Sequence, residues 1–490
     1  MNDKENKMKK HKLLCIVCAL LISACGKVNE APAEKAADAP VREGSAQESL
    51  SKTTSEEESG DSENDTALTE SSLSSEAVES EAESIITDLP DDLTPIPDGA
   101  ETELTIISDT DPNTCDDPFI EAGIEMFSLS GGTVRLDDSK YDDRYNEIAK
   151  RLMSGGEMPD MMWLDKTAFP SYAVKSLFQP VDSIIDFDSE LWAETKSAAD
   201  CYSIDGSHYA APISVTPASL LLYRTDVAEA SGLDDPYELY QNGDWNREEM
   251  LGLMEFFCEE NGHYGIGGQF ADALFRAEGL PVVGYDGNGF VNYLGNEKRQ
   301  SIADYLHDIK TRGLISDGSR DNCETALENG DVLFCSMGAL PYSDIQSLAE
   351  EKYSLVPMPS ENDACTVGNV NAIIWLSGSS KADAMKTWLE CLRYAADDPD
   401  ISDSFFRSKN GWTNEMIGLY MSQTGFDKPV VSEYVYGLTP QLNIVSSEQG
   451  HSAAELLTDP TISDDADNEF NSTYSDLIDS CLKDYNDLSR

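Results

Sequence analysis

Acidic and aromatic residues stand where two short apolar runs end. Asp109 and Asp111 follow the first run, and Trp163 and Asp165 close the second. Carboxylates accept hydrogen bonds from hydroxyl groups, and an indole ring offers an apolar face on which a sugar ring can stack. The four residues therefore indicate a binding site for a small polyhydroxylated solute. Core packing is the alternative for Trp163, and helix capping is the alternative for the two earlier aspartates.

Two more residues are candidates for the same site. Thr216 lies in a Ser-Val-Thr-Pro segment where we expect the chain to cross between two halves of the fold, and Trp412 could add a stacking face from the second half. Ordinary loop chemistry is the alternative for Thr216, and a core position is the alternative for Trp412.

Signatures of catalysis are missing from the sequence. It contains neither His-Glu-x-x-His nor Gly-x-Ser-x-Gly, and its histidines are scattered singly. We therefore expect no enzyme, no catalytic residue, no metal site and no cofactor. A cell-surface glycosidase stays open as the alternative, because such an enzyme needs only a pair of carboxylates.

A parallel sheet would bring the candidate residues together. Apolar patterns predict strands at 104–107, 133–136 and 161–164, with helices at 115–129 and 145–152 between them. A βαβαβ order of this kind forms a parallel sheet with helices on both faces, and ligands bind beyond the carboxyl ends of its strands. Further elements are predicted downstream: strands at 219–223, 332–335, 353–356 and 372–375, and helices beginning at Asn246 and spanning 381–394.

Glycine-rich and cysteine patterns carry less information. We interpret Gly265-Ile266-Gly267-Gly268 as a turn, because it lacks the third glycine of a dinucleotide-binding motif. Residues 286–289 are interpreted as a hairpin turn and not as a calcium loop. The 8 cysteines after Cys25 show no Cys-x-x-Cys spacing, so we assign no disulfide pairs.

The pattern of the N-terminal region predicts an export signal with a membrane anchor. A basic start and an apolar run lead to Leu21-Ile22-Ser23-Ala24-Cys25, which resembles a bacterial lipobox with Cys25 as the lipidated residue. From Gly26 to Ala100 the sequence has 20 acidic and 4 basic residues and no aromatic residue, which favours a disordered tether. The whole chain carries 92 acidic against 34 basic residues, a net charge of −58, which excludes nucleic-acid binding.

Several segments, in order, resemble the extracellular solute-binding proteins of family 1, the maltose-binding-protein-like receptors of ABC importers. The resemblance covers residues 101–490 and rests most clearly on 145–162, 177–182, 209–212 and 222–226. Residues 235–245 are similar to members common in Gram-positive bacteria. The chain departs from sugar-binding members in having Asp109-Thr110-Asp111 and Gly338-Ala339-Leu340 where these often have an aromatic residue, which predicts a thin aromatic platform.

The resemblance implies an α/β, two-lobed periplasmic-binding-protein-like fold, each lobe a sheet flanked by helices, with a hinge and an interlobe cleft. It implies a monomeric lipoprotein at the extracellular face of the cytoplasmic membrane that captures a small solute, a carbohydrate by preference, for an ABC permease. A binding protein for cationic solutes is a further alternative. The expected organisation is a signal peptide at 1–24, lipidated Cys25 and tether at 25–100, an N-terminal lobe at 101–213 and 355–396, and a C-terminal lobe at 214–354 and 397–490.

Overall fold

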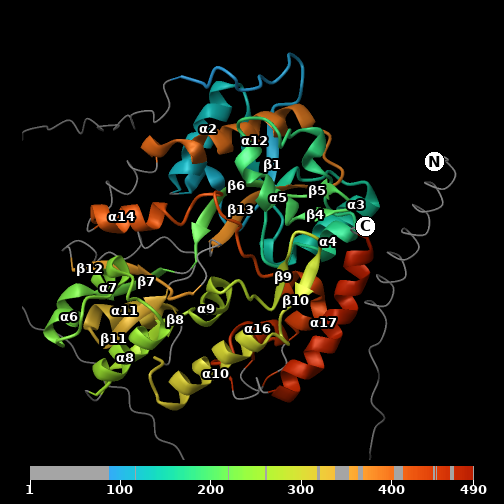
Figure 1. The fold of residues 1–490 in the computed structure, drawn as a ribbon. Coiled ribbons are helices and arrows are strands. Elements are labelled where there is room, and N and C mark those ends of the chain that lie inside the picture. The colour runs from blue at the N-terminus through green and yellow to red at the C-terminus, as the bar shows by residue number, and fades with distance from the viewer. Residues whose placement is uncertain are drawn as a thin grey trace, which may run out of the picture. The chain divides into compact units, whose positions relative to one another are not determined.

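A computed structural model describes the folded part of the chain, from residue 88 to residue 488 (Figure 1). The predicted signal peptide, Cys25 and most of the predicted tether lie outside the described residues. Within the range, the description leaves out 116, 219, 260–261, 317–319, 337–351, 362–367, 402–411, 445–446, 448–449 and 464–467.

The first sheet has five strands in the order β2-β1-β3-β13-β6. Strand β1 pairs in parallel with both β2 and β3, as the predicted βαβαβ order requires, while β13 runs antiparallel to β3 and β6. Its strands are β1 (Glu103–Ile107), β2 (Thr133–Leu136), β3 (Met161–Trp163), β6 (Ala211–Pro217) and β13 (Gly368–Trp375).

Helices cover both faces of this sheet because the side chains of each strand alternate between them. Met161 lies in one hydrophobic cluster with Phe127 and Trp388, whose rings are 5.4 Å apart, and Met162 lies in another cluster with Ile148. The flanking helices are α2 (Pro118–Leu129), α3 (Arg144–Ser154), α4 (Ser171–Val174), α5 (Lys196–Asp200) and α12 (Ala382–Asp397), and the small hairpin β4 (Ser203–Ile204) and β5 (Ser207–His208) lies beside them.

The second sheet has four strands in the order β12-β7-β11-β8. Strands β8 and β11 are parallel, and β7 runs antiparallel to β11 and β12. Asn246 caps the predicted helix by accepting from the backbone N–H groups of Glu248 and Glu249. The strands are β7 (Leu220–Arg224), β8 (Tyr264–Gly268), β11 (Val332–Ser336) and β12 (Tyr353–Pro357), with helices α6 (Thr225–Ala230), α7 (Pro236–Asn242), α8 (Arg247–Phe257) and α11 (Arg320–Asn329).

The interpretation of Gly265–Gly268 as a turn is wrong, because these residues form the buried strand β8. The glycines are required by close approach and not by chain reversal. A Cβ on Gly265 would lie 2.6 Å from Cβ of Met254, and a Cβ on Gly268 would lie 1.9 Å from the carbonyl oxygen of Ser336. Strand glycines of this kind mark tight packing.

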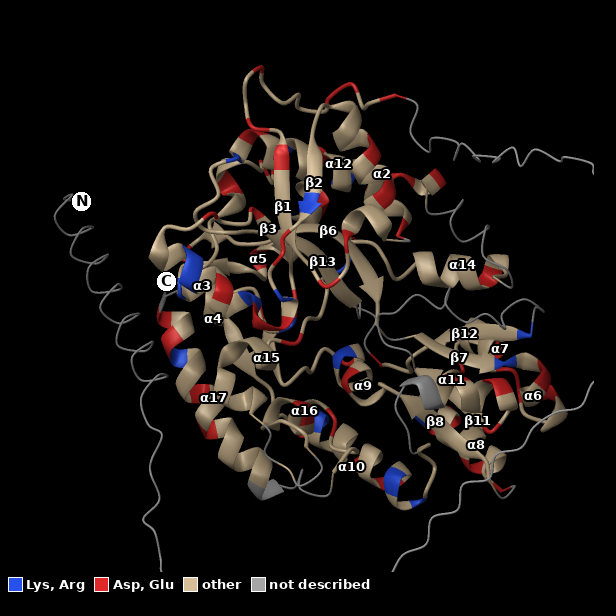
Figure 2. Ribbon diagram, turned by 180° about the vertical axis from the view of Figure 1, so that it is seen from behind, with Lys and Arg blue, Asp and Glu red and all other residues tan. Residues whose placement is uncertain are grey.

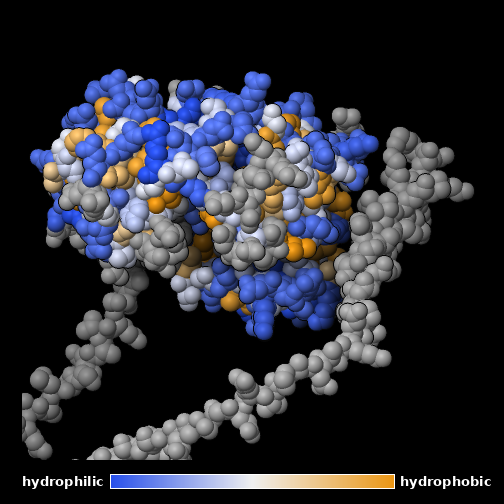
Figure 3. Space-filling view, turned by 90° about the horizontal axis from the view of Figure 1, so that it is seen from below, coloured by the Kyte–Doolittle hydropathy of each residue, from blue (hydrophilic) through white to orange (hydrophobic). Residues whose placement is uncertain are grey.

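The remaining elements come after β8 in the sequence, and several of them pack in a hydrophobic cluster with the first sheet. Residues 286–289 form the turn of an antiparallel hairpin, as predicted. On the face drawn in Figure 3, most described atoms are hydrophilic, with small hydrophobic patches between them. The elements are α9 (Ala271–Ala277), β9 (Val283–Tyr285), β10 (Phe290–Asn292), α10 (Glu297–Thr311), α14 (Asn414–Met421), α15 (Val435–Leu438), α16 (Ala453–Thr458) and α17 (Asn468–Leu488).

The chain changes sheets slightly later than expected. Strand β6 stays in the first sheet to Pro217, and β12 belongs to the second sheet, so the connections fall between Pro217 and Leu220 and between Pro357 and Gly368. The expected lobe boundaries at 213/214 and 354/355 fall inside β6 and β12, and the division into lobes stays a prediction.

The last part of the predicted tether is packed against the domain. Leu93 and Ile96 lie against the hydrophobic cluster around α2 and α12, and Thr94 donates to the carboxylate of Glu390 from its backbone N–H (2.8 Å) and its hydroxyl (3.0 Å). The hydroxyl of Thr387 donates to the carbonyl oxygen of Thr94. Residues 88–100, which we call the strap, are therefore not a free tether, and Figure 1 shows them in blue over α2 and α12.

Among the described helices, none has both the length and the apolar character that crossing a bilayer demands.

Candidate functional site

Three loops meet at the carboxyl edge of the first sheet. Asp109 follows β1, Tyr141 begins a short 3₁₀ turn after β2, and Asp165 follows β3. Burial and then the negative charge of Asp165 raise the pKa of Tyr141, and Asp109 adds a smaller upward contribution. The structure therefore brings Asp109 and Asp165 to one place, as the parallel sheet predicted.

Asp165 is held by its own neighbours. Its Oδ2 accepts from Nε and Nη2 of Arg144 at 3.0 and 2.7 Å and from the hydroxyl of Tyr145 at 2.7 Å. Its Oδ1 accepts from the backbone N–H and the hydroxyl of Thr167 at 2.7 and 2.5 Å. The Arg144 and Asp165 side chains are only 13% and 16% exposed. Asp165 thus anchors the loop, and direct contact with a ligand stays a prediction for it.

Cations and aromatic rings stack into a column beside this ion pair. The guanidinium carbon of Arg144 lies 4.1 Å from the ring centre of Tyr141 and 4.8 Å from that of Tyr145. The rings of Tyr145 and Tyr172 are parallel with centres 3.7 Å apart, and the amine of Lys175 lies 4.7 Å from the centre of Tyr172. Two rings this close leave no room between them, so Arg144 and Lys175 cover the outer faces.

Tyr141 is the end member of the column. Arg144 lies over its ring, and the half-buried side chain also packs against the hydrophobic cluster of α3 and α4. The negative charge of exposed Asp109 acts on it. The exposed part of a tyrosine ring near a carboxylate can stack on the apolar side of a ring-shaped solute, while the carboxylate accepts from the solute's hydroxyl groups. Sequence reasoning missed Tyr141, Arg144 and Tyr172, although an aromatic and a basic residue just after the second strand were a usable signal.

Tyr436 and Thr458, from later in the chain, lie near Lys166, the residue that follows Asp165. The amine of Lys166 lies 4.0 Å above the ring of Tyr436, whose hydroxyl is 2.8 Å from the hydroxyl of Thr458. Burial raises the pKa of Tyr436, and the negative charge of Asp272 raises it further. Asp272 begins α9 just after the carboxyl end of β8, so reading β8 as a turn hid it from the sequence analysis.

The other predicted site residues have structural partners elsewhere. Asp111 caps the 3₁₀ turn at 112–114, which is the capping alternative. Trp163 packs against the hydrophobic cluster of α2 and α12, and Trp412 lies edge to face with Tyr420, 5.8 Å between ring centres. Thr216 accepts from the side-chain amide of Asn371 at 2.7 Å. Their roles in ligand binding stay predictions.

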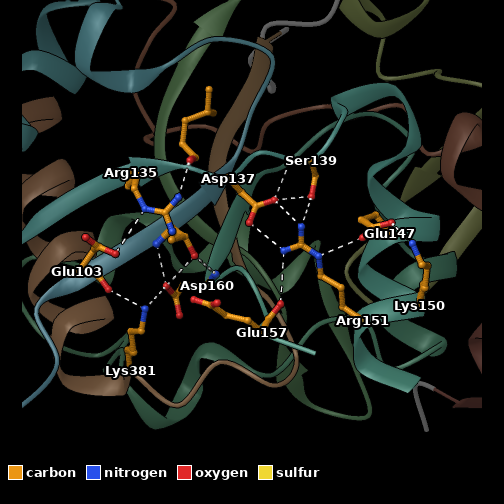
Figure 4. A network of polar contacts seen from close by, with 12 residues as sticks. Glu103, Arg135, Asp137, Ser139, Glu147, Lys150, Arg151, Glu157, Asp160 and Lys381 are labelled. Atoms are coloured by element: carbon orange, nitrogen blue, oxygen red, sulfur yellow. Dashed lines mark hydrogen bonds and ion pairs between the residues drawn. The ribbon is translucent and has the colours of Figure 1, made fainter. Parts of the chain in front are cut away.

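Two groups of charged contacts, one before the amino end of β3 and one after the carboxyl end of β2, are structural (Figure 4). Asp160 is 1% exposed and accepts from Thr105, from Ser379 at 2.6 Å and from the amine of Lys381 at 2.9 Å. Arg151 pairs with Asp137 at 2.9 Å in the same view. A cavity of about 640 Å³ lies beside Lys381. Lys381 joins the start of α12 to the residue before β3 and to the carbonyl oxygen of Glu103 in β1, and Arg151 joins α3 to the residue after β2.

We compared the sequence with those of known protein families. The sequence profile for bacterial extracellular solute-binding proteins matches residues 128–397, which is more than half of the chain. The chain belongs to this family. The predicted resemblance is confirmed at this level, and the family consists of binding proteins. No curated protein matches the sequence.

Solved structures of other solute-binding proteins share the fold of this solute-binding protein. An ABC transporter solute-binding protein from Thermotoga lettingae bound with alpha-D-tagatose has a TM-score of 0.53 at 17% identity and covers 80% of this chain and 100% of its own. The GacH receptor of Streptomyces glaucescens has a TM-score of 0.54 at 17% identity, covering 78% and 99%. The galacto-N-biose/lacto-N-biose I-binding protein of Bifidobacterium longum has a TM-score of 0.54 at 14% identity, covering 79% and 99%. The predicted two-lobed α/β fold is confirmed.

Proposed function

We propose that this solute-binding protein captures a small uncharged solute, a mono- or oligosaccharide, and delivers it unchanged to the permease of an ABC importer. The half-buried ring of Tyr141 near exposed Asp109, at the carboxyl edge of a parallel sheet, carries the proposal. Sugars present apolar ring faces for stacking and hydroxyl groups that donate to carboxylates. Three structures with the same fold were solved with a sugar or an acarbose compound, which supports this choice of ligand.

The candidate site holds basic side chains among its carboxylates. Arg144, Lys166 and Lys175 are basic, and Arg144 pairs with Asp165. The carboxylates of Asp272, Glu433 and Glu455 act on Tyr436. Acidic residues dominate the rest of the chain as well (Figure 2). A cationic solute would gain from this overall field but would meet the basic groups at the site, which favours an uncharged ligand.

The N-terminal region supplies the proposed location. Cleavage after Ala24 and lipidation of Cys25 would hold a monomeric receptor at the extracellular face of the cytoplasmic membrane, since two acyl chains suffice for stable anchoring. Residues 26–87, with the acidic composition of a disordered chain, would form the tether. The lobes would follow the two sheets, with the division placed at the connections described above.

Calorimetry across a panel of neutral mono- and oligosaccharides, cationic solutes and basic peptides tests this function. We expect binding to a neutral sugar that varies little between low and high salt, because screening acts on charged ligands. Analysis of the recovered sugar should show no cleavage. Binding confined to cationic ligands and weakened by salt would contradict the proposal. Release of reducing ends, abolished by a single carboxylate substitution, would favour the glycosidase instead.

A further inference from the structure

Arg276 is a buried cation that ties together three separate parts of the chain. The side chain lies on α9 and is 7% exposed. Its Nε donates to Oδ2 of Asp272 at 2.8 Å, and its Nη1 donates to the carbonyl oxygens of Gly368 at 3.0 Å and Val431 at 3.3 Å. The side-chain oxygen of Asn369 accepts from the same nitrogen at 3.4 Å.

The two carbonyl groups belong to segments that pass between the sheets. Gly368 opens β13 of the first sheet, directly after the connection that leaves β12 of the second sheet. Val431 lies between α14 and α15. Helix α14 packs in the hydrophobic cluster of the second sheet, whereas α15 packs in a cluster with α4 and other first-sheet elements. One guanidinium group therefore holds both later passages of the chain.

The carboxylate that Arg276 orients is partly exposed and lies near Tyr436, the ring on which Lys166 rests. The side chain of Asp272 is 32% exposed, so part of it is accessible to a solute. Its charge contributes, after burial, to the raised pKa of Tyr436, whose ring carries Lys166 of the first-sheet edge. Arg276 holds Oδ2 of Asp272 through Nε. Asp272 is thus placed to accept from a ligand hydroxyl group while Arg276 fixes its position.

We propose that Arg276 is a positioning residue that couples ligand capture at Asp272 to the two later passages of the chain between the sheets, the one that ends at Gly368 and the one that contains Val431. The inference rests on the proposed function. A guanidinium group is planar and rigid, so a shift of the carboxylate on which it rests is passed to the carbonyl groups at its other end. A solute that binds Asp272 then favours one arrangement of the connections, which is how a ligand shifts a conformational equilibrium.

The test compares Arg276→Lys with the wild type in the full chain. Lysine keeps the charge but cannot span three acceptors from one planar group. Two dyes, placed through bioorthogonal residues at exposed Glu121 on α2 and Glu229 on α6, report the distance between the sheets by single-molecule FRET. Arg312→Lys, in an exposed ion pair on α10, is the matched control. Asn369→Ala, which removes one exposed acceptor, serves as a milder variant with an unperturbed core.

We expect Arg276→Lys to broaden the ligand-free distance distribution and to weaken sugar binding by about tenfold, within the 5- to 150-fold range typical of coupled sites. The effects of Arg276→Lys and Asp272→Asn on affinity should be non-additive. Asn369→Ala should show the same broadening to a smaller degree. Arg312→Lys should match the wild type in both measurements.

A lowered melting temperature with unchanged distance distribution and affinity would overturn the inference, because a merely structural arginine behaves in that way. If the wild type binds no sugar of the panel, the proposed function fails. The ligand-free distribution still decides the role of Arg276: a width equal to that of the wild type refutes the coupling, and a broadened one supports it.

Discussion

Asp165→Ala should destabilise the protein far more than it weakens ligand binding directly. The substitution removes the acceptor of two Arg144 nitrogens, of the Tyr145 hydroxyl and of Thr167. Arg144 is left with its charge largely buried, and the hydroxyl of Tyr145 loses its close carboxylate partner. Breaking a fully buried pair costs about 3–5 kcal/mol. Some solvent reaches this one, so we expect a loss of about 2–3 kcal/mol in the free energy of unfolding.

Differential scanning calorimetry of the full chain measures this effect. A loss of that size should lower the melting temperature by about 3 °C in a folded part of this length. Asp165→Asn keeps an oxygen for Thr167 and should lose roughly half as much. Asp188→Ala is the matched control, because Asp188 pairs with Lys196 at the surface, where side chains are 81% and 46% exposed. Surface pairs of this kind contribute about 0–1 kcal/mol.

The contrary result would be an Asp165→Ala protein that melts with the Asp188→Ala control and yet binds sugar at least tenfold more weakly. Asp165 would then be a direct ligand contact, as its place after β3 first indicated. Asp109→Asn separates ligand contact from structural anchoring in the complementary way. Asp109 is exposed and accepts a long, 3.4 Å hydrogen bond from the hydroxyl of Ser108, so this variant should keep its stability and lose affinity.

Three further predictions concern Tyr141, the proposed lipid anchor at Cys25 and the buried carboxyl group of Glu433. Tyr141→Ala should weaken sugar binding by about 1–1.5 kcal/mol in calorimetry, the worth of roughly 50 Å² of stacked apolar surface, whereas Tyr141→Phe and the exposed-tyrosine control Tyr264→Ala should bind as the wild type does. Cys25→Ala should move the protein from the detergent phase to the aqueous phase in Triton X-114 partitioning, and unchanged partitioning would argue against lipidation. Burial raises the pKa of Glu433 from 4.5 to about 7, so the folded state holds this proton more tightly than the unfolded state and the stability it contributes is lost as the pH rises from 4.5 to 7. The free energy of unfolding of Glu433→Gln, measured with urea, should change less with pH between 4.5 and 7 than that of the wild type. An equal pH dependence in the two proteins would contradict the raised pKa of Glu433.

Local pattern predicted the first sheet well. The strands at 104–107, 133–136 and 161–164 and the helix at 145–152 appear within a few residues of their predicted bounds, because each alternates or repeats its apolar residues over a full element. The same pattern placed Asp109 and Asp165 at one edge. The prediction failed for β8, whose glycines allow the backbone to pack closely against Met254 and Ser336. Such a contact between distant residues cannot be inferred from neighbouring residues in the sequence.

Long-range partners account for the rest of the site. The acceptors of Arg144 and Arg276 lie 21 and up to 155 residues away along the chain, and the strap meets Glu390 from a distance of 296 residues. Composition marked residues 26–100 as one disordered segment, since nothing local distinguishes the last residues from those before them. Leu93 and Ile96 become informative only when the hydrophobic cluster of α2 and α12 is present to receive them.

The strap also decides where mechanical load enters the domain. A pull on the chain ahead of residue 88 reaches the folded part first through Thr94, whose bonds to Glu390 and Thr387 lead into α12. Helix α12 packs on α2 and the first sheet. Force applied through an anchor at Cys25, as proposed, would therefore enter the domain at the first sheet and its helices. The contacts of Arg276 with Gly368 and Val431 are separate from those of the strap, so such a force would not act on them directly.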